Sequence, residues 1–400
     1  MVSQPTPSKS SYDVVIVGGA VMGSSAAWWL SREPGFDGSI LVVEREPSYE
    51  GSSTAATNSC MRQQFSTEVN IRISQFAAEF VRTFPSWFDD PDVPALATDF
   101  FGYLYLADDA AFAETLRTNQ RLQSSWGAGT RLLSPEEIAT AYPFYNLDDI
   151  VCGSHNLVDE GYFDGGTMFD TFRRQARRNR VEYHRGEVVA IDRLGGRVTS
   201  ITLASGQTVA CGTVVNAAGP RAATVAAMVG VDLPVEPRKR YSFIFQAAEP
   251  LDRALPLTID PSGVHCRSDG GYYQAGCAPD DDRAVAPEDR VVDPNIWEDK
   301  IWPVLAHRIP AFERIKVVNR WVGHYAYNTL DQNAVLGPHP EVTNFHFING
   351  FSGHGLQQSP AMGRGLAEHI SYGEFRSLDL RPFSYQRILD GEPFVERAVI

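Results

Sequence analysis

Short runs of apolar, mostly β-branched residues alternate with glycine-containing turns and helical stretches along much of the chain. Near the start, residues 12–17 have the composition of a buried parallel strand, and a second such run covers residues 40–43. Residues 24–31, between these two runs, have a helical pattern. This order predicts a strand–helix–strand unit in which the two strands are parallel.

The same reasoning predicts elements farther along the chain. Residues 69–88 predict an amphipathic helix broken by Pro85, with a stripe of phenylalanines that we interpret as core packing. Gly195 and Gly196 lie between two apolar runs and predict a β-hairpin turn. Further strands are predicted at 100–106, 181–184, 187–191, 198–203, 213–220, 241–245 and 271–276, and further helices at 109–126, from 134 onwards and at 362–370.

The turn after the first strand carries the first chemical signal. Residues 18–23 contain three glycines, and Glu44 ends the second strand 21 residues after the last of them. Backbone N–H groups in such a turn can approach a pyrophosphate, and an acid at this distance can accept hydrogen bonds from a ribose diol. Ala20 occupies the central glycine position, where a methyl group needs slightly more room. The unit predicts a bound dinucleotide; the alternative is an ordinary crossover without a nucleotide.

The pattern of predicted helices and strands along the sequence divides the chain into two predicted domains. With 400 residues, 43% of them hydrophobic, the chain can bury more than one core. Residues 1–90, 146–230 and 325–372 predict a discontinuous α/β domain that binds the cofactor. Residues 91–145 and 231–324 predict a β-rich substrate domain, and residues 373–400 a C-terminal extension.

Charge and composition exclude several classes of function. A net charge of −14 argues against a nucleic-acid partner. The five cysteines show no metal-ligand spacing, so we expect no metal site and a reducing, cytoplasmic compartment. Residues 1–11 lack the apolar core of a signal peptide, and no apolar run reaches the roughly 18–20 residues of a membrane span.

A second glycine cluster, residues 349–360, precedes the last predicted helix and contains the sequence Gly-Phe-Ser-Gly-His-Gly. Its backbone N–H groups suit a flavin ring or phosphates. With residues 18–23, Glu44 and the segments 216–220 and 329–331, this cluster resembles the D-amino-acid-oxidase-like FAD oxidoreductases. Within them, the chain is most similar to the sarcosine oxidases and the FAD-dependent oxidoreductase domain-containing proteins. The resemblance extends from residue 12 to about residue 372. It implies a Rossmann-type FAD domain joined to a β-rich substrate domain.

The resemblance implies a set of residues that hold FAD by position. They are Gly18, Gly19, Ala20, Val21, Met22, Gly23, Glu44, Arg45, Val188, Ala218, Gly219, Gly350, Phe351, Ser352, Gly353, His354, Gly355, Leu356 and Gln357. Sarcosine oxidases attach their flavin to a cysteine, and the corresponding segment here, residues 325–328, contains none. The resemblance therefore implies non-covalent FAD.

A substrate site is implied in the same way. Arg62 falls where the sarcosine oxidases keep an arginine that binds the substrate carboxylate, a role suited to its planar fork. Gln357 stands in place of a second carboxylate-binding lysine, and Gln274 in place of a lysine credited with oxygen activation. The other candidates are His265, Tyr327 and His354 as catalytic residues, with Arg267 and His324 as further donors. A purely structural role is the alternative for each.

The family chemistry is oxidation of a C–H bond next to an amine nitrogen. It implies hydride transfer to flavin N5 and hydrolysis of the resulting imine to an amine and an aldehyde. We expect a small anionic amine as substrate, an N-substituted glycine such as iminodiacetate or sarcosine. Iminodiacetate, which gives glyoxylate, is the preferred candidate, because the candidate donors suffice for two carboxylates, whereas sarcosine would have only one cation for its carboxylate. Oxygen is the expected electron acceptor, giving H2O2. Two alternatives remain open: a dehydrogenase that uses a quinone or an electron-transfer protein, and a non-catalytic flavoprotein that acts as an assembly factor.

Overall fold

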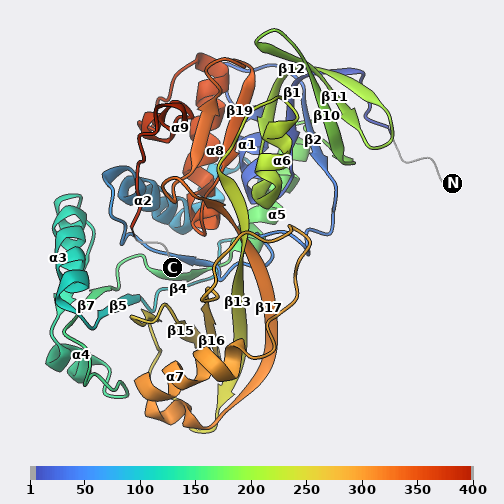
Figure 1. Ribbon diagram of the computed structural model, residues 1–400. Coiled ribbons are helices and arrows are strands. Elements are labelled where there is room, and N and C mark those ends of the chain that lie inside the picture. Colours follow the sequence, from blue (N-terminus) through green and yellow to red (C-terminus); the bar gives the residue numbers. More distant parts are fainter. Residues whose placement is uncertain (1–5, 398–400) are drawn as a thin grey trace.

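The computed structural model of the protein describes residues 6–397. It contains two large sheets, and parallel strands form the centre of the first (Figure 1). Their spatial order is β9, β2, β1, β12 and β19, and each neighbouring pair is parallel. Their bounds are β9 Glu182–Arg185, β2 Ile40–Glu44, β1 Ser11–Val17, β12 Thr208–Asn216 and β19 Phe345–Asn349. Three strands add antiparallel pairs at the edges: β10 (Val188–Leu194), β11 (Arg197–Leu203) and β18 (Val335–Pro338).

Helices cover both faces of this sheet. On one face α1 contacts both α5 and α8, and α2 packs against α8; α6 packs on the other face. The bounds are α1 Val21–Ser31, α2 Glu68–Arg82, α5 Gly165–Arg178, α6 Ala222–Ala227 and α8 Gly355–Tyr372.

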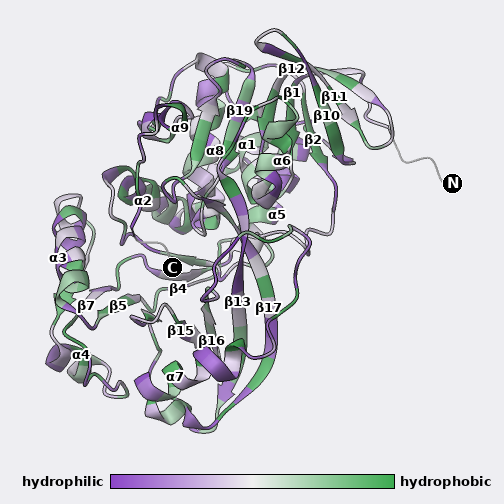
Figure 2. Cartoon of the chain, in the orientation of Figure 1, coloured by the Kyte–Doolittle hydropathy of each residue, from purple (hydrophilic) through white to green (hydrophobic). Residues whose placement is uncertain are grey.

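Strand β1 is apolar along its length because both of its faces are buried. Val14 and Ile16 point into the core under α1, whereas Val15 and Val17 point into the core under α6. The central strands of this sheet accordingly carry the hydrophobic colour in Figure 2. The burial of both faces explains why the sequence shows continuous apolar runs here rather than alternation.

The second large sheet lies beside the first and is mostly antiparallel. Its order is β17, β13, β16, β15, β14, β5, β7 and β6. The bounds are β17 Ile315–Asn328, β13 Val235–Ala247, β16 Tyr272–Cys277, β15 His265–Asp269, β14 Leu257–Ile259, β5 Tyr103–Ala107, β7 Cys152–Asn156 and β6 Arg131–Leu133. The long strands β13 and β17 connect the two parts of the molecule (Figure 1).

Shorter elements complete the fold. A small third sheet contains β3 (Cys60–Met61), β8 (Gly161–Phe163) and β4 (Thr98–Asp99). The remaining helices are α3 Ala110–Ser125, α4 Pro135–Ala141, α7 Trp302–Arg308 and α9 Gln386–Asp390, with short helical turns at Phe84–Trp87, Gly219–Arg221, Trp297–Ile301, Pro310–Glu313 and Arg381–Phe383.

Two sequence-based boundaries need correction. Strand β7 was assigned to the cofactor domain by the boundary at residue 146, but it pairs with β5 and β6 in the second sheet. The helix predicted over residues 69–88 ends at Arg82, and Pro85 falls in a separate helical turn. The hairpin at Gly195 and Gly196 is confirmed, since β10 and β11 pair antiparallel around them.

None of the helices within residues 6–397 is long and apolar enough to cross a membrane. Over the same residues, no three histidine, cysteine, aspartate or glutamate side chains gather in a way that could hold a metal ion.

Candidate active site

One cavity of about 350 Å3 extends from the first sheet to the second. Its first part is lined by the residues that follow the carboxyl ends of β1, β2 and β12, and by the loop between β19 and α8. Its second part is lined by residues of β13, β15 and β17, together with Cys60 and Arg62 around β3. Ligands bind at the carboxyl ends of parallel strands in folds of this kind, so the cavity lies where a cofactor is expected.

The glycine turn after β1 is tight enough to require two of its glycines. Gly18 has φ +101°, and a Cβ there would lie 2.5 Å from the carbonyl oxygen of Ala217. A Cβ on Gly23 would lie 1.9 Å from the carbonyl oxygen of Gly18. Ala20, by contrast, has φ −68° at the start of α1, which an L-residue adopts without strain. The alanine at the central position is therefore compatible with this turn.

Glu44 is fixed at the edge of the cavity by two backbone groups. Its carboxylate accepts hydrogen bonds from the backbone N–H of Gly19 (2.8 Å) and of Glu46 (2.8 Å). Burial nevertheless raises the pKa of this carboxyl above its usual value. The acid thus lies beside the glycine turn, as a ribose-binding acid must.

The second glycine loop, between β19 and α8, packs against strand β17. The backbone N–H of Ser352 donates to the carbonyl of Ala326 (3.0 Å), and the Ser352 hydroxyl accepts from the backbone N–H of Asn328 (3.0 Å). Gly353 has φ +98°, and a Cβ there would lie 2.5 Å from the Tyr325 ring. These contacts fix the loop against the second sheet at the junction of the two parts.

The residues predicted to hold FAD line this cavity, except Gly19 and Gly23, which shape the turn behind it. Gly219 has φ +55°, and a Cβ added to it would meet no atom within 4 Å. Space therefore remains at the end of β12. The tight turn, the fixed acid, the glycine loop and this open space all fit FAD.

Arg62 lies at the substrate end of the cavity and is buried. Its guanidinium lies 4.6 Å from the ring centre of Phe65 and 5.9 Å from that of Tyr103. His354, at the start of α8, packs edge-on against the same Phe65 ring at 5.1 Å. Arg62 and His354 therefore contact the same aromatic ring, close to the loop expected to hold the flavin.

Gln357 also lines the cavity, but its amide is bonded to the protein. It contacts the backbone of Arg62 and the hydroxyl of Ser74. The geometry assigns it to holding Arg62 rather than to contacting a substrate.

His265 lines the cavity from β15 and is neutral near pH 7. The Asn58 amide donates to its Nε2 at 3.2 Å. Burial, assisted by the nearby guanidinium groups of Arg267 and Arg240, lowers the pKa of His265 to about 4. This histidine supplies no positive charge to an anionic substrate.

Two of the predicted donors lie elsewhere. The ring of Tyr327 lies outside the cavity, stacked under Arg238 at 4.1 Å, and Tyr325 lines the wall instead. Arg267 is also outside the wall: its guanidinium pairs with Asp269 (2.7 Å) and contacts Gln274. Gln274 bonds to Asn58 and does not reach the cavity itself.

Arg240 lines the cavity from β13 and was not predicted from the sequence. Its guanidinium lies 4.5 Å from the Tyr325 ring centre and is bonded in a fork to Asp282 (2.7 and 2.9 Å). In the run Arg238-Lys239-Arg240 the two arginines are two residues apart on a strand, so their side chains point to one face of the sheet, and this spacing was a usable signal. The pairing with Asp282 was not visible, since that acid comes from a distant loop.

Comparison with known proteins identifies the family. The family profile described as DAO: FAD dependent oxidoreductase matches residues 13–369. This chain belongs to that family of FAD-dependent oxidoreductases. It is 38% identical to FAD-dependent oxidoreductase domain-containing protein 1 from Bos taurus, over 97% of this chain and 87% of that protein. It is 23% identical to sarcosine oxidase subunit beta from Arthrobacter sp, over 97% of this chain and 94% of that protein.

The fold is shared with solved structures of the same kind. L-proline dehydrogenase from P. horikoshii matches with a TM-score of 0.82 and 24% identity, over 96% of this chain and 99% of that chain. The predicted family, the mixed α/β fold, the oxidoreductase class and FAD as cofactor are thereby confirmed. The chain is an FAD enzyme of the DAO family, related to amino-acid oxidases and dehydrogenases.

Proposed function

We propose that this DAO-family enzyme oxidises a secondary or tertiary amino acid, an N-substituted glycine of the sarcosine or iminodiacetate type. The observation that carries the proposal is a buried arginine, Arg62, on the wall of the cavity whose other part fits FAD. Bound FAD supplies the oxidising chemistry, removal of a hydride from the carbon next to the substrate nitrogen. The protein has to hold that carbon close to the flavin and keep the amine neutral.

The position of Arg62 in the cavity favours a substrate that carries a carboxylate. A guanidinium offers two parallel N–H groups to the two carboxylate oxygens, which fixes the orientation of the substrate as well as binding it. Tyr103, Leu257 and Tyr325 line the same end of the cavity. Apolar and aromatic walls favour the neutral form of an amine, because burial penalises its protonated form.

The charges around the cavity favour one carboxylate over two. A second carboxylate, as in iminodiacetate, would be directed towards Arg240 or His265. Arg240 is bonded to Asp282, and the pKa of His265 is lowered to about 4. We therefore expect sarcosine-like substrates to bind more tightly than iminodiacetate.

Oxygen is the proposed electron acceptor, and a separate acceptor is the second candidate. A positive charge near the flavin would help to form superoxide from oxygen. In the described chain no lysine lines the cavity, Arg240 is paired, His265 is neutral, and Arg62 is the group proposed to bind the substrate carboxylate. This arrangement favours the dehydrogenase alternative more than the sequence alone did.

The test is flavin absorbance near roughly 450 nm, followed while purified holoenzyme is mixed with candidate amines without oxygen. Sarcosine, dimethylglycine, iminodiacetate, D-proline, L-proline and D-alanine form the panel. Bleaching by an N-substituted glycine, followed by recovery and peroxide on aeration, supports the oxidase. Bleaching that persists in air but reverses with a quinone supports the dehydrogenase. If no amine bleaches the flavin, the proposal is wrong and the assembly-factor alternative gains.

Arg62→Met and Arg320→Met provide matched variants for this test. Arg62 lines the cavity, whereas Arg320 is an exposed residue of β17. We expect Arg62→Met to lose bleaching at substrate concentrations that saturate the wild type, and Arg320→Met to keep it. Equal bleaching in both variants would remove Arg62 from the substrate site.

A further inference from the structure

We propose that residues 392–397, at the C-terminal end of the described chain, form part of the active-site framework, with Glu396 as a positioning residue for Arg62. The inference rests on the proposed function, in which Arg62 binds the substrate carboxylate. From the sequence, residues 373–400 were predicted to be a C-terminal extension of the two domains. In the structure, residues 392–397 lie between the segment that carries Arg62 and the segment that supports the flavin loop.

Glu396 is fully buried, and its carboxylate is bonded to three residues of one segment. It accepts hydrogen bonds from the backbone N–H of Ser66 (2.8 Å), the Ser66 hydroxyl (2.6 Å), the Thr67 hydroxyl (3.1 Å) and the Asn70 amide (2.9 Å). Thr67 is the residue that precedes α2. An acid at a helix N-terminus is favoured by the N–H groups exposed there.

This contact bears directly on Arg62. Only residues 63–65 separate Arg62 from Ser66, and the ring of Phe65 contacts both the Arg62 guanidinium and the His354 ring. A shift of Ser66 would move Phe65 and with it the surface on which the guanidinium rests. A buried charge with several hydrogen bonds is well suited to prevent such a shift, because every donor that lost its partner would be left buried and unpaired.

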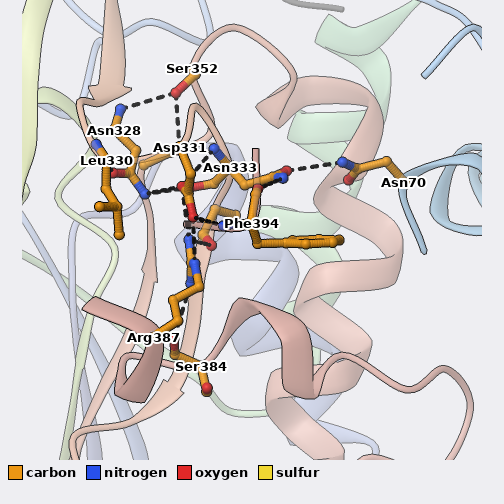
Figure 3. A network of polar contacts seen from close by, with 11 residues as sticks. Asn70, Asn328, Leu330, Asp331, Asn333, Ser352, Ser384, Arg387 and Phe394 are labelled. Carbon is orange, nitrogen blue, oxygen red and sulfur yellow. Dashed lines mark hydrogen bonds and ion pairs between the residues drawn. The ribbon is translucent and has the colours of Figure 1, made fainter. Parts of the chain in front are cut away.

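The same segment is tied to the flavin loop through Asp331 (Figure 3). The backbone N–H of Phe394 donates to Asp331 (3.0 Å), and the backbone N–H of Glu396 donates to the carbonyl of Asp331 (3.0 Å). Asp331 accepts in turn from the amide of Asn328 (3.0 Å), whose backbone N–H donates to Ser352.

Arg387 supplies the counter-charge in this network. Its Nε donates to Asp331 at 2.6 Å, and both side chains are nearly inaccessible to solvent. The network in Figure 3 also reaches Asn70, whose amide bonds both Asn333 (2.9 Å) and Glu396. One short segment therefore contacts the supports of both halves of the site.

The test uses full-length holoenzyme carrying Glu396→Gln, with Glu392→Gln as the control. An amide at position 396 keeps the size of the side chain but places an NH2 group among donors. Glu392 is exposed and lies in the same segment. The primary readout is titration with acetate, a carboxylate without an oxidisable amine, followed by the flavin absorbance spectrum.

We expect the apparent Kd for acetate to rise about tenfold in Glu396→Gln and to stay unchanged in Glu392→Gln. With an oxidisable substrate, KM should rise by the same factor while kcat at saturation changes little. Glu396→Asp should restore part of the affinity. Unchanged acetate affinity and KM in Glu396→Gln would overturn the inference.

Two further measurements keep the outcomes separate. If Glu396→Gln does not fold, Ser66→Ala removes the hydrogen bond from the Ser66 hydroxyl to Glu396 and should still raise the Kd for acetate. An unchanged Kd in that variant would also overturn the inference. If acetate does not perturb the wild-type flavin at all, the proposed carboxylate site at Arg62 fails first. A loss of affinity in Glu396→Gln that accompanies an equal loss of FAD content would indicate a general structural role and contradict positioning of Arg62.

Discussion

Gln357 holds the backbone of Arg62 through both ends of one side-chain amide. Its oxygen accepts from the Arg62 N–H at 2.9 Å, and its nitrogen donates to the Arg62 carbonyl at 3.3 Å. The same nitrogen donates to the Ser74 hydroxyl at 3.0 Å, which adds a contact to α2. Gln357 belongs to α8, so the helix that begins at the flavin loop also fixes the arginine expected to bind substrate.

Replacing Gln357 should therefore weaken substrate binding without removing any group that touches the substrate. In Gln357→Leu the backbone N–H of Arg62 loses its partner in a buried site, which costs about 1–3 kcal/mol. We expect a KM increase of roughly tenfold, with a lower melting temperature and an unchanged flavin content. Steady-state kinetics and thermal unfolding check this. A rise in KM with full stability would instead indicate that Gln357 contacts the substrate.

Arg62→Lys tests the geometry of carboxylate recognition separately from its charge. Lysine keeps the positive charge but loses the planar pair of N–H groups and the contact of the guanidinium with the Phe65 ring. We expect KM for the preferred amino acid to rise by roughly ten- to a hundredfold, since a charge-assisted pair contributes about 1.5–3 kcal/mol. Initial rates over a range of substrate concentrations measure it. A Lys variant as active as the wild type would argue for simple charge attraction.

Glu44→Ala should weaken FAD binding. The acid is bonded to the backbone of the glycine turn and lies at the edge of the cavity, so its loss removes both a ribose acceptor and a brace for Gly19. We expect the Kd for FAD to rise by roughly tenfold or more. The ratio of flavin to protein absorbance after gel filtration reports this. Glu50→Ala, at an exposed position outside the cavity, serves as the control.

The cofactor half of the site was predictable because local sequence fixes it. The turn at residues 18–23, Glu44 and the loop at residues 350–355 are each formed by contiguous residues or by one strand–helix–strand unit. Their glycines are required by backbone conformation and close approach, as Gly18 and Gly353 show. Such requirements leave a direct mark on the sequence.

The substrate half was predicted less well because it depends on pairing across distant strands. Tyr325 and Tyr327 are two residues apart on β17, so both side chains point to the same face of the sheet. This spacing could not indicate which of the two reaches the cavity. Arg240 and Asp282 come from different segments and were not connected in the sequence. Glu396 lies 330 residues from Ser66, its hydrogen-bond partner. Long-range contacts of this kind leave no periodic signal.

The protonation of Glu160, which bonds to the residues directly after Arg62, should make the stability of the protein depend on pH. This carboxyl is fully buried and accepts hydrogen bonds from the backbone N–H of Gln63 (2.7 Å) and the amides of Gln64 (2.9 Å) and Asn156 (2.8 Å). Burial outweighs these bonds and raises its pKa from an ordinary value near 4.5 to about 7. The folded protein therefore holds a proton on Glu160 between these two values, whereas the unfolded chain has released it.

The sign of the effect on stability follows from this difference. The contribution of Glu160 is fully present below about pH 4.5, falls as pH rises towards 7, and is constant above that value, because both states are then ionised. Glu160→Gln removes this dependence. We expect the unfolding free energy of the wild type minus that of Glu160→Gln to decrease as pH rises across this window. Urea denaturation at each pH measures both values. A difference that stays constant with pH would show that the carboxylate is ionised in the folded protein, and that its three donors outweigh burial.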